Sequence, residues 1–313
     1  MKKVLYLITI FIAQNIFGQQ VDCDLQYTAP VTQKSYSSSL ACVNENVGSN
    51  TNDVLYEPTV NTLIKTVRVN LHVMQKSNPL IPDNFVSTNP DHMAYLNSIF
   101  NGGNYPSVND VYSNLDAPLW GGATNDSYIV DSRIRFQLMG IYFHKDDLGW
   151  SNNGGNCGSY CYDNYKINEN HELNIFLYGT HDINNTSVGG CGPGFNGEST
   201  NYIVYKNTYI DYLAHLPGTP GSGLLGGNPG VVNPLIAHEI GHCLGLHHSW
   251  LSTQFTLFPD IYSPHLSVWC SPPVDQYCTN NVMGYSNDKS FLSPRQLGHL
   301  HQLLSGGWRE QNN

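Results

Sequence analysis

The segment HEIGHCLGLHH, residues 238–248, gathers side chains that are able to bind a metal ion. His238 and His242 are four residues apart, so on an α-helix their rings share one face, with Cβ atoms about 6 Å apart. Imidazoles directed at a single point are typical ligands of Zn²⁺. We therefore expect this segment to begin as a helix and to bind zinc.

Gly245 accounts for a third ligand. The next turn of a straight helix would carry a third imidazole past the metal, whereas glycine adopts positive φ, ends the helix and turns the chain back. His248 then approaches from outside the helix, and His247 has no place in this arrangement. The fourth position stays open for water, which distinguishes a catalytic zinc site from a structural one.

Glu239 follows the first ligand and is expected beside the bound water, not on the metal. Zinc lowers the pKa of that water towards about 7, and a carboxylate within reach takes its proton as the water attacks a carbonyl. The sequence thus predicts metal-assisted hydrolysis, with Glu239 as general base and then general acid.

Other histidines lack this spacing. His171-Glu172 has Ile175 where a second histidine would be needed, so we interpret it as a pair flanking a strand. His299 and His301 are two residues apart on an expected helix, point to different faces and are interpreted as surface residues.

The elements that must position these residues are both strands and helices. Apolar residues alternate with polar ones in 66–73, and further strands are expected at 133–143, 173–178 and 201–206, with Gly140 a candidate bulge. Three helices are expected to begin at a capping residue followed by proline, Asn89-Pro90, Asn233-Pro234 and Ser293-Pro294, with Gln296 completing a capping box in the last. Together they indicate an α+β fold. The stretch 216–233, dense in glycine and proline, is either a rim of the site or a plain connection.

The N-terminus has the layout of a secretory signal peptide over 1–18, with Lys2 and Lys3 before an apolar run at 4–13. A retained membrane anchor is the alternative, but that run is too short to span a bilayer. We expect a secreted, extracellular protein with no membrane span in its mature chain. The segment 19–60 is polar and without periodicity, and is expected to be loosely ordered.

The composition of the 313-residue chain fits export. Its eight cysteines suit an oxidising compartment, and the spacing allows local disulfides between Cys157 and Cys161 and between Cys270 and Cys278, without deciding the connectivity. The net charge is −10 and no basic cluster could meet phosphates, so nucleic acid is not an expected partner. We expect a monomer that acts on protein or peptide substrates.

The pattern HExxHxxGxxH over residues 238–248 resembles the signature of the metzincin zinc endopeptidases. That clan also has a methionine-containing turn under the metal, and NNVMGYS at 280–286 supplies Met283. The resemblance implies that Tyr285, two residues further on, helps to stabilise the oxyanion. It also implies a zincin fold, in which a mixed twisted sheet, a backing helix and the active-site helix stand over a smaller coil-rich subdomain with a terminal helix.

Within the clan, the chain is most similar to the pappalysin-like family, through NNVMGYS, FLSPRQLGHLHQLL (291–304) and LNIFLY (173–178). It departs from the family at Cys243, where an aromatic residue is typical, and we expect the thiol to face the core. The resemblance implies a substrate peptide along an edge strand, expected within 189–202. Calcium occurs in relatives, but no carboxylate cluster in the sequence assigns a calcium site.

The expected organisation is a signal peptide (1–18), an N-terminal segment that is a candidate pro-segment (19–60), an upper catalytic subdomain (61–248) and a lower one with the methionine turn (249–313). As in some relatives, Cys23 or Asp24 could cover the zinc in a latent form. The expected function is that of a secreted zinc endopeptidase. The alternatives are a non-catalytic zinc-containing binding protein of the same fold, which an intact Glu239 disfavours, and a zinc hydrolase of a non-peptide amide.

Overall fold

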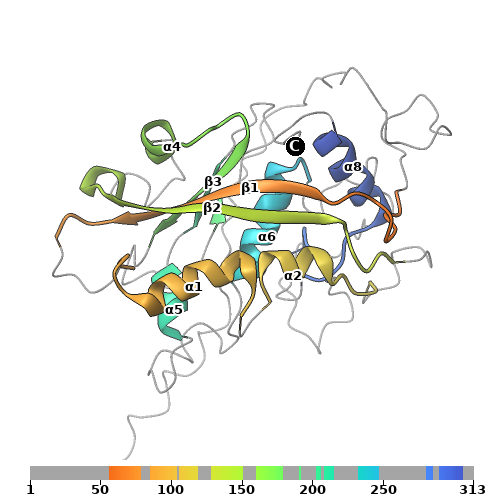
Figure 1. Cartoon of the computed structure of the whole chain (residues 1–313), viewed down its shortest axis with the longest axis horizontal. Helices are drawn as coiled ribbons and strands as arrows, with labels where there is room; N and C mark the ends of the chain where they lie inside the picture. The colour runs from red at the N-terminus through yellow and green to blue at the C-terminus, as the bar shows by residue number, and fades with distance from the viewer. Residues whose placement is uncertain are drawn as a thin grey trace, which may run out of the picture.

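The computed structural model of the chain describes a core of helices and strands and part of the connections between them (Figure 1). None of the helices that it describes has the length and apolar run that crossing a membrane requires. The described residues are 56–78, 85–103, 106–118, 128–150, 160–178, 190–191, 202–205, 208–214, 232–246, 280–284 and 289–305.

Within these residues, five strands form one mixed sheet in the order β2-β1-β3-β5-β4. The first four pair in parallel, and the short β4 pairs antiparallel with β5 at the edge. The four strand regions expected from alternation are confirmed, with the ends moved by one or two residues. The strands are β1 (Lys65–Gln75), β2 (Ile134–Lys145), β3 (Glu172–Tyr178), β4 (Gly190–Cys191) and β5 (Tyr202–Tyr205).

A β-bulge interrupts the β1–β2 pairing next to the expected glycine. Val69 pairs with Leu138 and Asn70 with Gly140, so Met139 is the extra residue. A side chain at residue 140 would overlap the ring of Tyr142, which lies back over this glycine.

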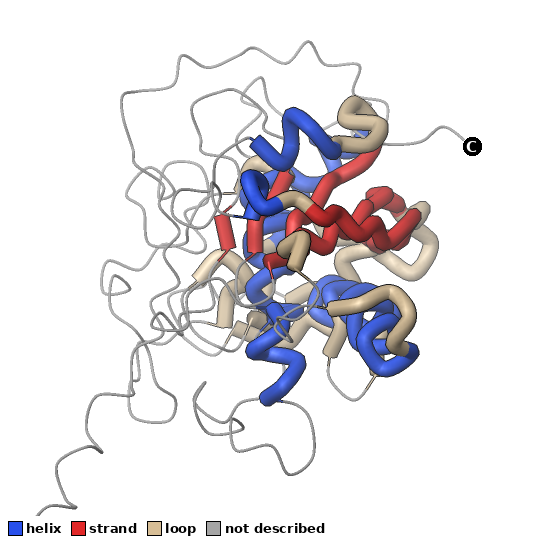
Figure 2. The backbone as a smooth tube through the Cα atoms, turned by 90° about the vertical axis from the view of Figure 1, so that its left-hand side faces the viewer, coloured by secondary structure: helices blue, strands red, loops and turns tan. Residues whose placement is uncertain are grey.

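Helices cover both faces of the sheet (Figures 1 and 2). Below the sheet in Figure 1 lie α1 (Pro90–Asn101), α2 (Val108–Ser113) and α5 (Thr208–Ala214), and α6 (Val232–Cys243) also packs on this face. Above it lies α4 (Tyr160–Tyr165). The last described helix is α8 (Pro294–Ser305).

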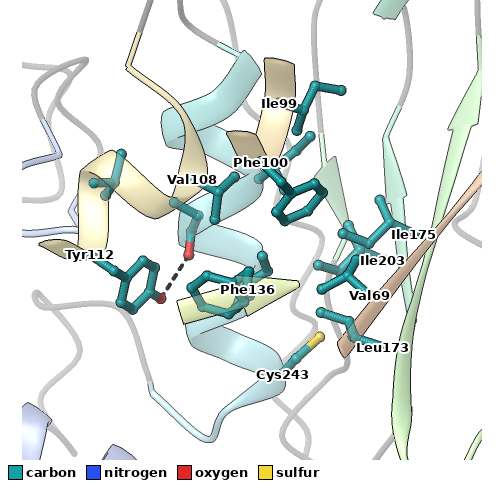
Figure 3. Close-up of a cluster of buried hydrophobic side chains, with 14 of the residues drawn as sticks. Val69, Ile99, Phe100, Val108, Tyr112, Phe136, Leu173, Ile175, Ile203 and Cys243 are labelled. Atoms are coloured by element: carbon teal, nitrogen blue, oxygen red, sulfur yellow. Dashed lines mark hydrogen bonds between the residues drawn. The ribbon is translucent and has the colours of Figure 1, made fainter. Parts of the chain in front are cut away.

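The main core lies between the sheet and the helices α1, α2 and α6 (Figure 3). Alternate residues of β1, Val67, Val69 and Leu71, are fully buried in it. Tyr112 of α2 is also fully buried, and its hydroxyl donates to the carbonyl of Ala237 at 3.1 Å, which ties α2 to α6. The Cys243 thiol lies in this core, as its position in the sequence predicted.

Two of the three expected helix starts are confirmed. The Asn89 side chain accepts hydrogen bonds from the backbone of Asp91 and His92 at the start of α1, and Ser293 caps α8. The expectation that Asn233 caps α6 is wrong, because the helix already begins at Val232. The Asn233 side chain is buried and donates instead to the carbonyl of Pro106 at 2.9 Å.

The N-terminal segment is ordered at its end. The backbone N–H of Tyr56 donates to the carbonyl of Pro294 at 3.2 Å, and its ring packs on His301 with centroids 4.6 Å apart. Tyr56, near the end of the segment that we expect to be loosely ordered, therefore packs against α8. Residues 1–55, including Cys23 and Asp24, lie outside the described residues.

Candidate metal centre

Helix α6 brings two imidazoles to one point. The Nε2 atoms of His238 and His242 are 3.2 Å apart, and the two rings stand nearly perpendicular, at 86°. Both side chains are buried, with 1% and 3% of their surface exposed. The helical four-residue spacing that the sequence predicted thus produces convergent nitrogen atoms.

Hydrogen bonds to backbone carbonyls determine which ring nitrogens carry hydrogen. Nδ1 of His238 lies 2.7 Å from the carbonyl oxygen of Val282, and Nδ1 of His242 lies 2.8 Å from that of Leu246. A carbonyl can only accept, so each Nδ1 is the N–H donor. In the neutral imidazoles, both Nε2 atoms then carry lone pairs that face each other, and a cation between them removes the repulsion.

The geometry fits zinc. Two nitrogens at 2.0–2.1 Å from a tetrahedral ion would lie about 3.3 to 3.4 Å apart, close to the observed separation. Burial, aided by the nearby positive charge of Lys289, lowers the pKa of His242 to about 4, which leaves its imidazole neutral and able to bind a metal. An Nδ1–H that donates to a carbonyl is the usual support of a metal-binding histidine.

The structure describes only some of the other predicted site residues. Glu239 is fully buried on α6, directly after the first histidine. His248 and Tyr285 lie outside the described residues. Within the described part of the chain, no group of three or more potential metal-binding His, Cys, Asp or Glu side chains is present, so the third ligand stays a prediction.

Gly245 ends α6 as the sequence predicted. Its φ is +84°, and the backbone N–H groups of Gly245 and Leu246 donate to the carbonyls of His242 and Gly241, both at 2.9 Å. This is a Schellman motif, in which the left-handed residue turns the chain back over the last helical turn. The same turn brings the Leu246 carbonyl to Nδ1 of His242, so the helix end also orients the His242 ring.

The predicted methionine turn lies beside the two histidines. The backbone N–H of Gly284 donates to the carbonyl of Asn281 at 2.8 Å and closes a turn around Val282 and Met283. Met283 is fully buried, and its sulfur lies against Gly241, between the two histidines in the sequence. The turn thus packs against α6 at Gly241 and supplies the Val282 carbonyl to His238.

Comparisons with known proteins give structural likenesses alone. No family model matches the chain, and no curated protein matches it. Mature mirolysin of Tannerella forsythia, solved with a cleaved peptide, is 15% identical over 79% of this chain and 96% of its own, with a TM-score of 0.43. A promirolysin mutant from the same organism is 14% identical over 80% and 86%, with a TM-score of 0.44. The assignment of the site therefore rests on its own geometry.

Two predictions about the remaining histidines differ in outcome. Glu172 begins β3 and accepts hydrogen bonds from the amides of Asn70 and Asn168, at 2.6 and 2.9 Å, as expected for a structural residue. His301, in contrast, is not a surface residue, since it is buried and its Nε2 lies 2.7 Å from the Ser132 carbonyl. His299 is half-buried, and its ring lies against Gly245.

The structure adds site residues that the sequence did not reveal. Lys289 is buried, and its ammonium group donates to the carbonyl of Gly284 in the methionine turn. Gly241 leaves the space that Met283 fills. The position of Gly241 between the two histidines was the only sign in the sequence that it belongs to the site, and nothing in the sequence marked Lys289 as a site residue.

The described residues include only part of the expected cysteine pairs and of the expected edge strand. Cys161 is a buried free thiol whose sulfur lies 2.8 Å from the Tyr178 hydroxyl, so the expected disulfide between Cys157 and Cys161 is not formed at Cys161 in the structure. Of the expected edge segment 189–202, Gly190–Cys191 forms β4 at the edge of the sheet.

Proposed function

We propose that this protein is a secreted, zinc-dependent endopeptidase. The observation that carries the proposal is the pair of buried Nε2 lone pairs, 3.2 Å apart on His238 and His242, whose Nδ1 atoms both donate to carbonyls. The buried carboxylate of Glu239 follows the first of them directly. We propose His248 as the third ligand, from its position after Gly245.

Bound zinc would supply a Lewis acid that lowers the pKa of a water and polarises a carbonyl oxygen. Glu239 takes the proton of the water as it attacks the scissile carbonyl and returns it to the leaving amine nitrogen. Tyr285 donates a hydrogen bond to the oxyanion of the tetrahedral intermediate. The fixed tautomers of His238 and His242 keep their Nε2 lone pairs directed at one point throughout.

The sheet edge supports a peptide as the substrate. Strand β4 is one of the two edge strands of the described sheet, and α6 packs against β4 and β5. An extended peptide could add its backbone hydrogen bonds to such an edge, beside the helix that carries Glu239. We propose that the cleft lies between an upper subdomain, 61–248, and a lower one, 249–313. We also propose that the chain is a metzincin of the pappalysin-like family and that residues 1–18 are a signal peptide.

Cleavage of a mixed peptide library by the zinc-loaded chain, measured beside Glu239→Ala, tests the function. Cleavage by the first and its loss in the second would support an endopeptidase and reveal the sequence preference. If neither cleaves, removal of residues 19–55 tests whether the N-terminal segment keeps the enzyme latent, and this cut preserves the contacts of Tyr56 with α8. Continued inactivity with zinc bound would contradict the peptidase proposal.

A further inference from the structure

A buried pair of amide side chains joins the methionine turn to helix α8. Asn281 Nδ2 donates to Gln296 Oε1 at 2.8 Å, and Gln296 Nε2 donates back to Asn281 Oδ1 at 3.2 Å. Both residues are buried, with 1% and 0% of their surface exposed. Each amide thus satisfies the other, and the orientation of both is determined by the two reciprocal bonds.

Each amide is also anchored to its own element. Oε1 of Gln296 accepts the backbone N–H of Ser293 at 3.0 Å, while the Gln296 backbone N–H donates to Oγ of Ser293 at 3.2 Å, which completes the capping box of α8. Oδ1 of Asn281 accepts the backbone N–H of Met283 at 2.9 Å. The helix start and the methionine turn are therefore held by one continuous set of hydrogen bonds.

This set of bonds ends at a histidine of the candidate metal centre. Val282 lies between Asn281 and Met283 in the sequence. The Asn281 side chain donates to Gln296 of α8 and also accepts a hydrogen bond from the backbone N–H of Met283. The carbonyl of Val282 accepts Nδ1–H of His238 at 2.7 Å. A displacement of the turn would move this carbonyl and rotate the ring, and with it the direction of the Nε2 lone pair.

We propose that Gln296 and Asn281 are positioning residues of the metal centre, which fix the orientation of the His238 ring through the Val282 carbonyl. The inference rests on the proposed function, since it assumes that His238 binds zinc. The turn has a further brace in the hydrogen bond from the Val282 N–H to the Phe291 carbonyl, at 2.9 Å. Loss of the amide pair is therefore expected to weaken metal binding without abolishing it.

The test compares the full-length chain with Gln296→Glu, which keeps the side-chain size and the acceptor but replaces the Nε2 donor by an oxygen that faces Asn281 Oδ1. Gln296→Met removes both bonds without adding charge. Zinc affinity is measured by competition with a chromophoric chelator, and the visible spectrum of the cobalt-loaded protein reports the ligand geometry. We expect zinc to bind about 10- to 100-fold more weakly in both variants, with a shifted cobalt spectrum.

Leu300→Ala is the matched control, because Leu300 is a fully buried residue of the same helix whose side chain forms no hydrogen bonds. It should lower the unfolding temperature and leave the zinc affinity and cobalt spectrum of the folded protein unchanged. Unchanged affinity and spectrum in folded Gln296→Glu and Gln296→Met would overturn the inference, as would failure of both to fold. If the unmodified chain binds no zinc, or if His238→Ala binds it equally well, the proposed function itself fails.

Discussion

The sulfur of Met283 occupies the space beside Gly241 that the Cβ atom of any larger residue would need. Gly241 lies on α6 between the two metal-binding candidates, and Met283 is fully buried in the turn that packs against this glycine. The close approach of helix and turn lets the Val282 carbonyl reach His238. The absence of a side chain at residue 241 is thus a requirement of the site.

Gly241→Ala should therefore destabilise the protein, although alanine is the better helix former. Overpacking against Met283 is expected to cost about 1 to 3 kcal/mol, which exceeds the gain of up to about 1 kcal/mol in helix propensity. Denaturant unfolding of the single and double variants checks this. On a Met283→Ala background the same substitution should cost less, and equal costs in both backgrounds would contradict the contact.

Gly245→Ala should weaken both stability and zinc binding. An L-residue at φ +84° costs about 1 to 2 kcal/mol, and its Cβ would lie 2.7 Å from Nε2 of His299. Thermal unfolding and zinc titration measure the two effects. When Gly245→Ala is made in a His299→Ala background, the contact with the histidine ring is absent, so only the backbone strain should remain. If Gly245→Ala alone is as stable as the unmodified chain, the role of the turn is refuted.

Glu239→Gln should lower peptide cleavage by about 10²- to 10⁴-fold while zinc content stays unchanged, because the amide cannot accept the proton of the water. Initial rates and metal analysis on the same preparation separate the two. Glu172→Gln is the matched control, since Glu172 is also buried and also follows a histidine. Comparable losses in the two variants would exclude a specific role for Glu239.

Stability should fall between pH 6.5 and about 4 through His72. This residue is fully buried on β1, its Nε2 lies 2.9 Å from Asn174 Oδ1, and its Nδ1 lies 3.0 Å from Nε2 of His144. Burial lowers its pKa from 6.5 to about 4, and the neighbouring His144 contributes in the same direction. The unfolded chain then binds the proton first as the pH falls, so about 3 kcal/mol of stability is lost across this window.

Replacement of His72 by glutamine, which gains no proton, isolates this contribution. Urea unfolding at a series of pH values should show a shallower fall in the free energy of unfolding below pH 6.5 for His72→Gln than for the unmodified chain. Parallel curves would show that His72 does not carry the pH dependence.

Long, regular elements could be predicted from the sequence because their signals are local. Alternating apolar residues predicted β1, and Asn89 and Ser293 predicted the starts of α1 and α8. The helices α2, α4 and α5 were missed, since six or seven residues are too few for a helical period to emerge. The capping box of Ser107 and Asp110 was the one signal for α2.

The convergence of the His238 and His242 rings could be predicted because their spacing is helical. Their orienting partners could not be predicted, because the carbonyls of Val282 and Leu246 have no sequence signature. The burial of His301 was missed for a related reason. Its partners, Ser132 and Tyr56, come from distant parts of the chain, and only the folded arrangement makes a buried histidine acceptable there.

The most direct test of the account is the zinc content of the purified chain after equilibration with a small excess of zinc and removal of the unbound metal. The unmodified chain should retain one zinc ion per molecule, and a His238→Ala/His242→Ala variant, shown to be folded, should retain none. A chain that retains no zinc, or a double variant that holds it as tightly as the unmodified protein, would contradict the metal centre on which the proposed function depends.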